Sequence, residues 1–187
     1  GLVGSEMCIR DRVIMTRSDD TFLSLEERTS FANQNNADYF VSLHRNTGEG
    51  NGVETWIRSD ADDKTQALAK NIMDNLDAAG ISRNRGVKKG TQKSESKDYY
   101  VNLHTNMPAC IVELGFMNSP TDNQLFDANV ENYAKAIGDA VLKTYEAYGK
   151  DGADATESVE DVPGTEEQIS TETVSYTHLR AHETGAY

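Results

Sequence analysis

Apolar residues gather in two short uninterrupted runs, at 39–44 and 110–116. Neither run shows the polar alternation of a half-exposed strand, which is typical of strands that are covered on both faces of a parallel or mixed sheet. Longer segments, 62–79 and 119–149, repeat apolar positions at helical spacing. The pattern predicts an α/β fold in which helices cover the two central strands.

Shorter signals predict the remaining elements. Ser24 and Glu27 fit a capping box, so a helix is expected from there to about residues 35–36. Gly80 fits the end of the helix over 62–79. The stretch 83–100 is polar, and its pattern does not assign it to a helix or a strand. Short strands are expected at 13–16, 53–57 and 99–103.

The two ends of the chain differ from its middle in composition. The net charge is −13. Eight acids and no Lys or Arg lie between residues 151 and 174, so the predicted folded part carries a net charge of −5. The acidic stretch has few large apolar residues and is expected to be disordered. Residues 1–12 and 174–184 resemble translated adapter sequence, and we interpret both as foreign to the gene.

Composition argues against several classes of function. A mildly acidic folded part does not suit a nucleic-acid partner, which requires a basic face. No stretch approaches the roughly 20 apolar residues of a membrane span. Cys8 and Cys110 make neither a disulfide framework nor a metal spacing, and Cys110 is expected to be a small buried hydrophobe.

Two residues at the ends of the apolar runs could carry chemistry. His44 ends the first run, and ligands of open α/β sheets gather beyond the carboxyl ends of strands, although a lone histidine there is more often a core residue. Glu113 shares one face of the second run with Ile111, where a charge is costly unless it is paired. Two interpretations stay open for Glu113: a salt bridge to Arg17 or Arg28, or a general acid or base that faces whatever His44 holds.

Two further polar residues are weaker candidates. Glu54 is explained by a half-exposed position on the expected strand 53–57. His104 could reach the same cleft as Glu113, but a role at the surface or in a turn is favoured.

Several separated motifs carry a family resemblance. They are Val13–Arg17, Leu25 with Arg28, Ala32–Asn33, Ala37–Asp38, Ser42–His44 with Asn46, Gly52–Glu54, Arg85–Lys88 and Met107–Asn118. In this order they cover nearly all of 13–149 and resemble the zinc-dependent N-acetylmuramoyl-L-alanine amidases of the Amidase_3 type.

The resemblance implies a fold, a cofactor and a reaction. It implies a mixed, mostly parallel sheet flanked by helices, the zinc exopeptidase-like amidase fold, and a Zn²⁺ ion held by two histidines and a glutamate. His44 matches one metal ligand, and Glu113 matches the catalytic glutamate. The implied reaction is hydrolysis of the amide between N-acetylmuramic acid and L-alanine in peptidoglycan, outside the cell, in the cell wall or in the periplasm.

The chain also departs from the family pattern. The His-Gly-Gly turn of the family's first strand and the glutamate of its first helix have no counterpart, because residues 1–12 stand in their place. Glu6 and Cys8 do not match these motifs. We therefore expect an amidase domain that lacks the first strand and helix and is inactive by itself. The expected division is a non-native leader at 1–12, a truncated catalytic domain at 13–149 and an acidic disordered tail with a non-native end at 150–187.

Two alternatives remain at this point. The first is a non-catalytic domain of the same fold that binds the cell wall or regulates another protein. The second is a different member of the zinc exopeptidase-like fold that acts on another amide. Because His44 and Glu113 are both present, an active ancestor is favoured.

Overall fold

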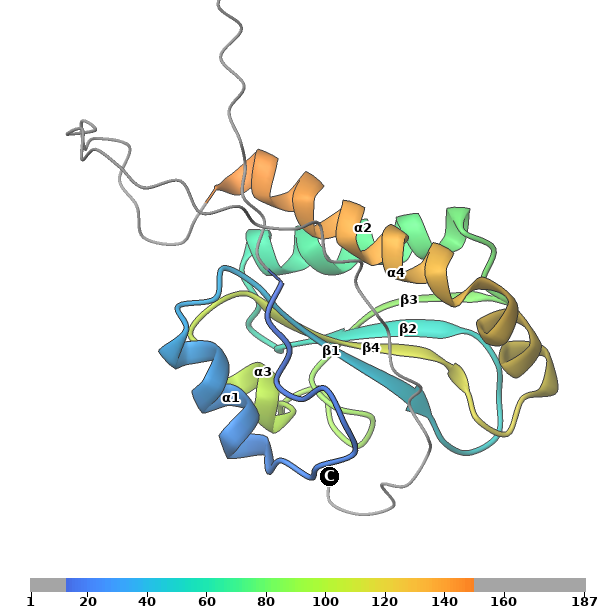
Figure 1. Cartoon of the computed structure of the whole chain (residues 1–187), viewed down its shortest axis with the longest axis horizontal. Helices are drawn as coiled ribbons and strands as arrows, with labels where there is room; N and C mark the ends of the chain where they lie inside the picture. Colours follow the sequence, from blue (N-terminus) through green and yellow to red (C-terminus); the bar gives the residue numbers. More distant parts are fainter. Residues whose placement is uncertain (1–12, 150–187) are drawn as a thin grey trace, which may run out of the picture.

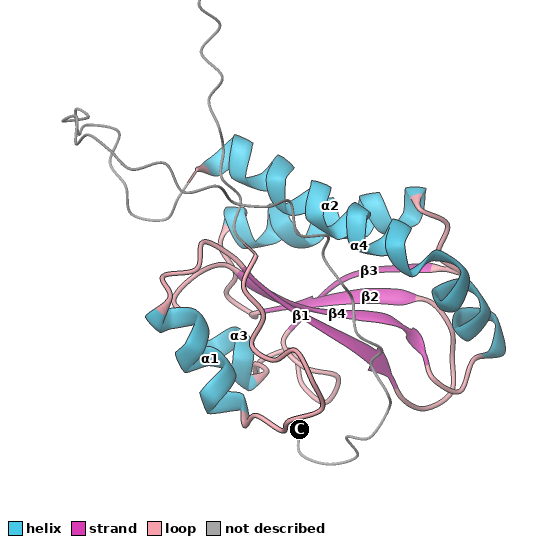
Figure 2. Cartoon of the chain, viewed as in Figure 1, coloured by secondary structure: helices cyan, strands magenta, loops and turns pink. Residues whose placement is uncertain are grey.

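The structure, a computed structural model, describes residues 13–149, which form a mixed four-stranded sheet with helices on both faces (Figures 1 and 2). The strand order is β1-β4-β2-β3. β1 pairs with β4 and β2 with β3 in parallel, whereas β2 and β4 are antiparallel, so the predicted mixed, mostly parallel sheet is confirmed. The predicted leader and acidic tail lie outside the described residues. The strands are β1 (Phe40–Asn46), β2 (Val53–Ile57), β3 (Asn84–Lys89) and β4 (Ala109–Phe116).

Two pairs of helices cover the sheet. α2 (Asp63–Ala78) and α4 (Pro120–Tyr148) lie side by side on one face, and α1 (Leu25–Gln34) and α3 (Tyr100–His104) lie on the other (Figure 1). Burial of apolar side chains in both layers is the main stabilising contribution. The larger core includes Leu68, Ile72, Leu76, Cys110, Val112, Ile137 and Ala140, and the smaller includes Ala32, Phe40, Trp56, Val101 and Ile111.

Local sequence explains where the helices begin and end. The predicted capping box is present: the Glu27 amide donates to Ser24 Oγ (3.2 Å), and the Ser24 amide donates to the Glu27 carboxylate (2.7 Å). Asp62 caps α2 by accepting from the Thr65 amide at 2.8 Å. Gly80 follows α2 with a φ of +91°, a conformation that glycine adopts at little cost. These helix predictions are confirmed.

Two predictions for short segments were wrong, and a polar segment to which no element was assigned contains a strand. Residues 13–16 form no strand, and Val13 is 76 % exposed. The segment 99–103 is the start of helix α3, because Val101 and Asn102 turn inward while Leu103 stays exposed. The polar stretch at 83–100 contains strand β3, which is half-buried because it pairs only with β2 among the described strands.

Strand β4 separates the two faces of the sheet as predicted. Cys110, Val112 and Leu114 belong to the core under α2 and α4, and Ile111 belongs to the core under α1 and α3. Cys110 is fully buried, and burial raises the pKa of its thiol to about 12, in keeping with its expected role as a hydrophobe. Glu113 therefore points to the same face as Ile111, at the end of β4.

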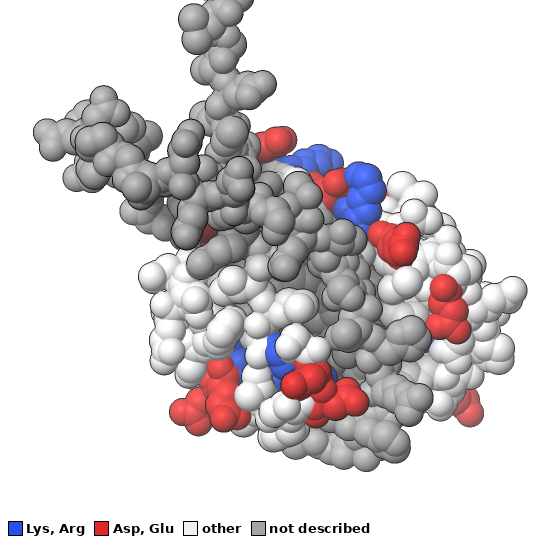
Figure 3. Space-filling model, viewed as in Figure 1, with Lys and Arg blue, Asp and Glu red and all other residues white. Residues whose placement is uncertain are grey.

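Surface properties add two observations. On the face drawn in Figure 3, the described acidic and basic side chains are interspersed. Within residues 13–149, no helix combines the length and the apolar character needed to cross a membrane.

Candidate active site

Three polar residues form one row across three strands. His44 of β1 pairs in register with Glu113 of β4, and Glu113 pairs in register with Glu54 of β2. Residues directly opposite each other on neighbouring strands point to the same face, and the strands are about 4.8 Å apart. The side chains of His44, Glu113 and Glu54 therefore emerge together, although the sequence separates them widely.

The strand directions explain this meeting. β1 and β4 are parallel, so their carboxyl ends, which carry His44 and Glu113, lie at the same edge of the sheet. β2 is antiparallel to β4, so it contributes Glu54 from its beginning. The expectation that candidate residues gather beyond the carboxyl ends of the strands is met by His44 and Glu113.

Glu113 is a buried carboxylate with an uncompensated oxygen. The residue is 8 % exposed, and its Oε2 atom has no hydrogen-bond partner within the described part of the chain. Burial, and secondly the charge of Glu54, raise the pKa of Glu113 to about 7. None of the ion pairs found within residues 13–149 joins Glu113 to Arg17 or Arg28, so the salt-bridge interpretation has no support. A carboxyl group with this pKa can both accept and donate a proton near neutral pH.

Glu54 contradicts the expectation of a half-exposed position. It is 2 % exposed, because it lies between two paired strands and beside Trp56. Its carboxylate accepts hydrogen bonds from Asn46 Nδ2 (3.0 Å), Trp56 Nε1 (3.1 Å) and Arg85 Nε (2.7 Å). The arginine and the two neutral donors stabilise its charge. The sequence placed Glu54 on a strand but gave no sign that the strand would lie next to Glu113.

His44 is half-buried, and its Nε2 atom lies 2.8 Å from Ser42 Oγ, which projects from the same face two residues earlier. Zinc sites in proteins use three or four ligands. Within residues 13–149, no three His, Cys, Asp or Glu side chains come together in a way that could hold a metal ion. The described residues thus contribute one candidate ligand and by themselves do not fit a complete zinc centre.

His104 does not join the row. It is exposed on α3, where its Nδ1 lies 2.9 Å from the Tyr100 carbonyl oxygen and its ring stacks on Tyr100 at 3.8 Å. The favoured surface role of His104 is confirmed.

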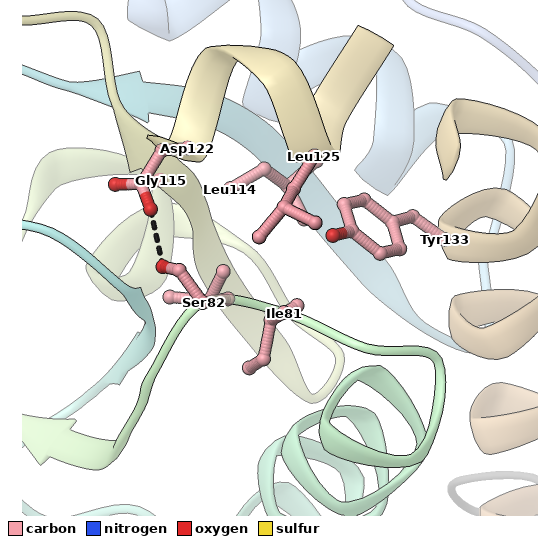
Figure 4. Close-up of a pocket in the computed structure, with 8 residues that line it drawn as sticks. Ile81, Ser82, Leu114, Gly115, Asp122, Leu125 and Tyr133 are labelled. Atoms are coloured by element: carbon pink, nitrogen blue, oxygen red, sulfur yellow. Dashed lines mark hydrogen bonds between the residues drawn. The ribbon is translucent and has the colours of Figure 1, made fainter. Parts of the chain in front are cut away.

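A second buried carboxylate, Asp122, lies in the first turn of α4, and its hydrogen bonds join several segments of the fold. It accepts hydrogen bonds from the Gly52 amide (3.0 Å) and the Phe116 amide (2.8 Å). It also accepts one from the Ser82 hydroxyl, which Figure 4 shows. These contacts join the entry of β2, the end of β4 and the loop before β3. A pocket of only about 10 Å³ remains beside it, too small for a ligand other than water. We refer to this group as the Asp122 junction.

The junction requires close approach of the backbone at Gly115. Gly115 has a φ of +89°, and a Cβ atom built there would lie 2.8 Å from Asp122 Cβ. Only glycine accommodates both conditions without movement of α4 or β4. The glycine two residues after Glu113 therefore helps to fix the end of the strand that carries the candidate catalytic residue.

Comparison with relatives places the chain in a family. The sequence profile of Amidase_3, N-acetylmuramoyl-L-alanine amidase, matches residues 9–143. The uncharacterized Bacillus subtilis protein YqiI is 36 % identical over 72 % of this chain and 63 % of its own length. The B. subtilis N-acetylmuramoyl-L-alanine amidase LytC is 32 % identical over 71 % of this chain and 26 % of its own length. The chain thus spans less than two thirds of these two relatives.

Solved structures show the same fold. The N-acetylmuramoyl-L-alanine amidase of Clostridium difficile 630 superposes with a TM-score of 0.66 and 30 % identity, over 74 % of each chain. The catalytic domain of the amidase CwlV from Bacillus (Paenibacillus) polymyxa superposes with a TM-score of 0.61 and 31 % identity, over 72 % of this chain and 73 % of that one. The chain therefore belongs to the N-acetylmuramoyl-L-alanine amidase family Amidase_3.

Proposed function

We propose that residues 13–149 are the catalytic part of a peptidoglycan hydrolase. The bond cleaved is the amide between the lactyl group of N-acetylmuramic acid and the L-alanine of the stem peptide. The observation that carries the proposal is Glu113, a buried carboxyl group with an unpartnered oxygen and a pKa raised to about 7, directly beside His44 in a chain of this family.

Glu113 is assigned the proton transfers of this hydrolysis. It accepts a proton from the attacking water and delivers a proton to the nitrogen of the leaving L-alanine. A pKa near 7 suits both directions, because neither protonation state is strongly disfavoured at neutral pH. Proton transfer by a positioned side chain contributes about 10²–10⁴-fold to a rate.

Zinc is part of the proposal as the cofactor of the family, with His44 as one of its ligands. The described residues do not complete a ligand set, and the sequence before His44 contains no other histidine. We therefore assign no step to the metal. We expect the 187-residue polypeptide, assayed alone, to bind zinc weakly and to hydrolyse no peptidoglycan.

The proposed location follows from the substrate. Peptidoglycan lies outside the cytoplasmic membrane, so the protein would act outside the cell, in the cell wall or in the periplasm. In the proposed domain division, residues 13–149 make up the catalytic part.

The test uses a chimera in which the first strand and helix of the Clostridium difficile 630 amidase precede Val13. We expect it to release stem peptides from purified sacculi. Glu113→Gln should retain zinc and lose about 10²–10⁴-fold in rate, whereas His44→Ala should lose the metal. Glu131→Gln, an exposed position on α4, is the matched control and should behave as the parent. A Glu113→Gln variant as active as this control would refute the assignment.

A non-catalytic cell-wall-binding domain of the same fold is the second candidate. It predicts that the 187-residue chain sediments with sacculi and that the chimera, even with stoichiometric zinc, releases no peptide.

A further inference from the structure

A cleft of about 380 Å³ lies on the β3 side of the candidate catalytic row. Glu54 forms part of its wall, so the cleft begins one strand away from Glu113. Trp56 and Phe116 provide apolar surface, and Arg85 and Lys88 of β3 provide positive charge.

An irregularity in β3 brings both cations to this cleft. Val53 pairs with Asn84, but Thr55 pairs with Val87, so two residues of β3 lie opposite the single residue Glu54. Gly86 takes a φ of +79° at this bulge. Without the bulge, residues three apart would point to opposite faces of the sheet. With it, Arg85 and Lys88 both point to the face of Glu54.

The register also assigns the next lysine to the other side. Lys88 pairs with Trp56, whose indole donates to Glu54 on the site face, whereas Lys89 pairs with Ile57. Ile57 belongs to the core under α2 and α4. Lys88 and Lys89 are therefore neighbouring lysines on opposite faces of one strand.

Arg85 is held in a fixed orientation. Its Nε donates to Glu54 at 2.7 Å, and its guanidinium lies 5.0 Å from the centre of the Phe116 ring. Among residues 13–149, the Nη1 atom reaches only the Asn51 carbonyl oxygen, at 3.5 Å. A guanidinium anchored by one edge keeps its remaining N–H groups available in a defined direction.

The two cations of the cleft keep donors that are not used within the described residues. Glu54 already accepts from three donors, so Asn46, Trp56 and Arg85 compensate its charge. The side-chain amine of Lys88 forms no hydrogen bond or ion pair with any residue in the described range 13–149. The other carboxylate that lines the cleft, Glu49, is exposed at its rim.

We infer that Arg85 and Lys88 bind the carboxylate of the second residue of the stem peptide. This contact selects peptides with a free carboxylate over peptides in which it is amidated. The inference rests on the proposed function. The distance between strands β4 and β3 supports the choice of the second residue. Two strand spacings, about 10 Å, separate β4 from β3. Two extended residues cover about 7 Å, and the long Arg and Lys side chains span the remainder. A charge-assisted, bidentate contact distinguishes a carboxylate from its amide.

The test measures binding rather than turnover, on the full 187-residue chain. The probes are N-lactoyl-L-alanyl-D-glutamate and the same compound with its α-carboxylate converted to a primary amide. Calorimetric titration should give about fivefold tighter binding of the acid, the upper range for a partly exposed ion pair. Lys88→Gln should abolish this preference. Lys89→Gln removes the same charge from the opposite face and should retain it.

Other outcomes overturn the inference. Equal binding of acid and amide by the parent chain, an unchanged preference in Lys88→Gln, or the same loss in Lys89→Gln would each do so. Circular dichroism melting of both variants separates a local effect from unfolding. Acid preference without any hydrolysis by the chimera would refute the proposed function alone, whereas hydrolysis without acid preference would refute this inference alone.

Discussion

Two buried carboxylates near the end of β4 have opposite surroundings. Asp122, 4 % exposed, accepts hydrogen bonds from two backbone amides and a hydroxyl. Glu113, 8 % exposed, has an oxygen without a partner and the charge of Glu54 on the next strand. Similar burial therefore accompanies different roles, and the hydrogen-bond partners distinguish them. Asp122 joins three segments of the fold, while the burial of Glu113 with one unpartnered oxygen costs stability, which is consistent with the proton transfer proposed for it.

The largest effect is expected from the Asp122 junction. Asp122→Ala leaves the amides of Gly52 and Phe116 buried without acceptors, and each such group costs about 1–3 kcal/mol. We expect a loss of about 3–5 kcal/mol in the free energy of unfolding, measured by urea denaturation. Asp122→Asn retains one acceptor oxygen and should lose less. A loss in Asp122→Ala no larger than in an exposed control, Asp139→Ala, would remove the contrast with Glu113.

Glu113 should show the reverse behaviour. Its pKa is about 7 in the folded state against 4.5 as an ordinary value, so the folded state holds the proton more strongly. This stability is fully present below pH 4.5 and is lost as the pH rises through 7. Glu113→Gln has no carboxyl group to titrate and lacks this loss. The difference in free energy of unfolding between variant and parent should therefore shift in favour of the variant by about 2–3 kcal/mol from pH 4 to pH 8. Denaturation curves at both pH values test it, and a parallel pH dependence of both proteins would contradict it.

Gly115 links the two carboxylates, and its substitution should affect stability through the backbone. Gly115→Ala places a methyl group 2.8 Å from Asp122 Cβ at a φ of +89°. We expect a loss of about 1–3 kcal/mol by thermal denaturation. Gly80→Ala also changes a glycine with positive φ, but nothing lies within 4 Å of the added atom. The difference between the two variants isolates the contact with Asp122, and equal losses would show that only the backbone conformation matters.

The smallest effect concerns the coupling between Glu54 and Glu113. Because the charge of Glu54 contributes to the raised pKa of Glu113, Glu54→Gln should lower that pKa. The ¹³C chemical shift of the Glu113 carboxyl carbon, followed with pH, measures the change. Glu49→Gln removes a carboxylate at the rim of the cleft and serves as the control. An unchanged pKa in Glu54→Gln would show that burial alone sets the protonation of Glu113.

The sequence predicted the elements whose signals are local. The capping box at Ser24, the helical spacing up to Gly80 and the apolar run around Glu113 each depend on neighbouring residues, and each was confirmed. Strand β3 was missed because its half-buried, polar residues lack an apolar pattern. The segment 99–103 was assigned to a strand although tertiary packing of Val101 and Asn102 favours a helix.

The candidate site was predictable residue by residue but not as an arrangement. His44 and Glu113 stood out because each is polar at the end of an apolar run. Glu54 did not, because its importance depends on the register between β2 and β4. The two cations of the cleft depend on a bulge opposite Glu54, and a bulge is decided by the pairing of two strands rather than by either sequence alone.

The strand order has a consequence for the order of events in folding. β4 lies between β1 and β2, yet both of these neighbours precede it in the chain. During synthesis, the gap between β1 and β2 stays unfilled until residues 109–116 leave the ribosome. Pairings between distant segments form slowly, and unpaired strand edges promote aggregation in the meantime. We therefore expect nascent chains that stop before residue 109 to be sensitive to proteases, and protection to appear only once β4 has been added.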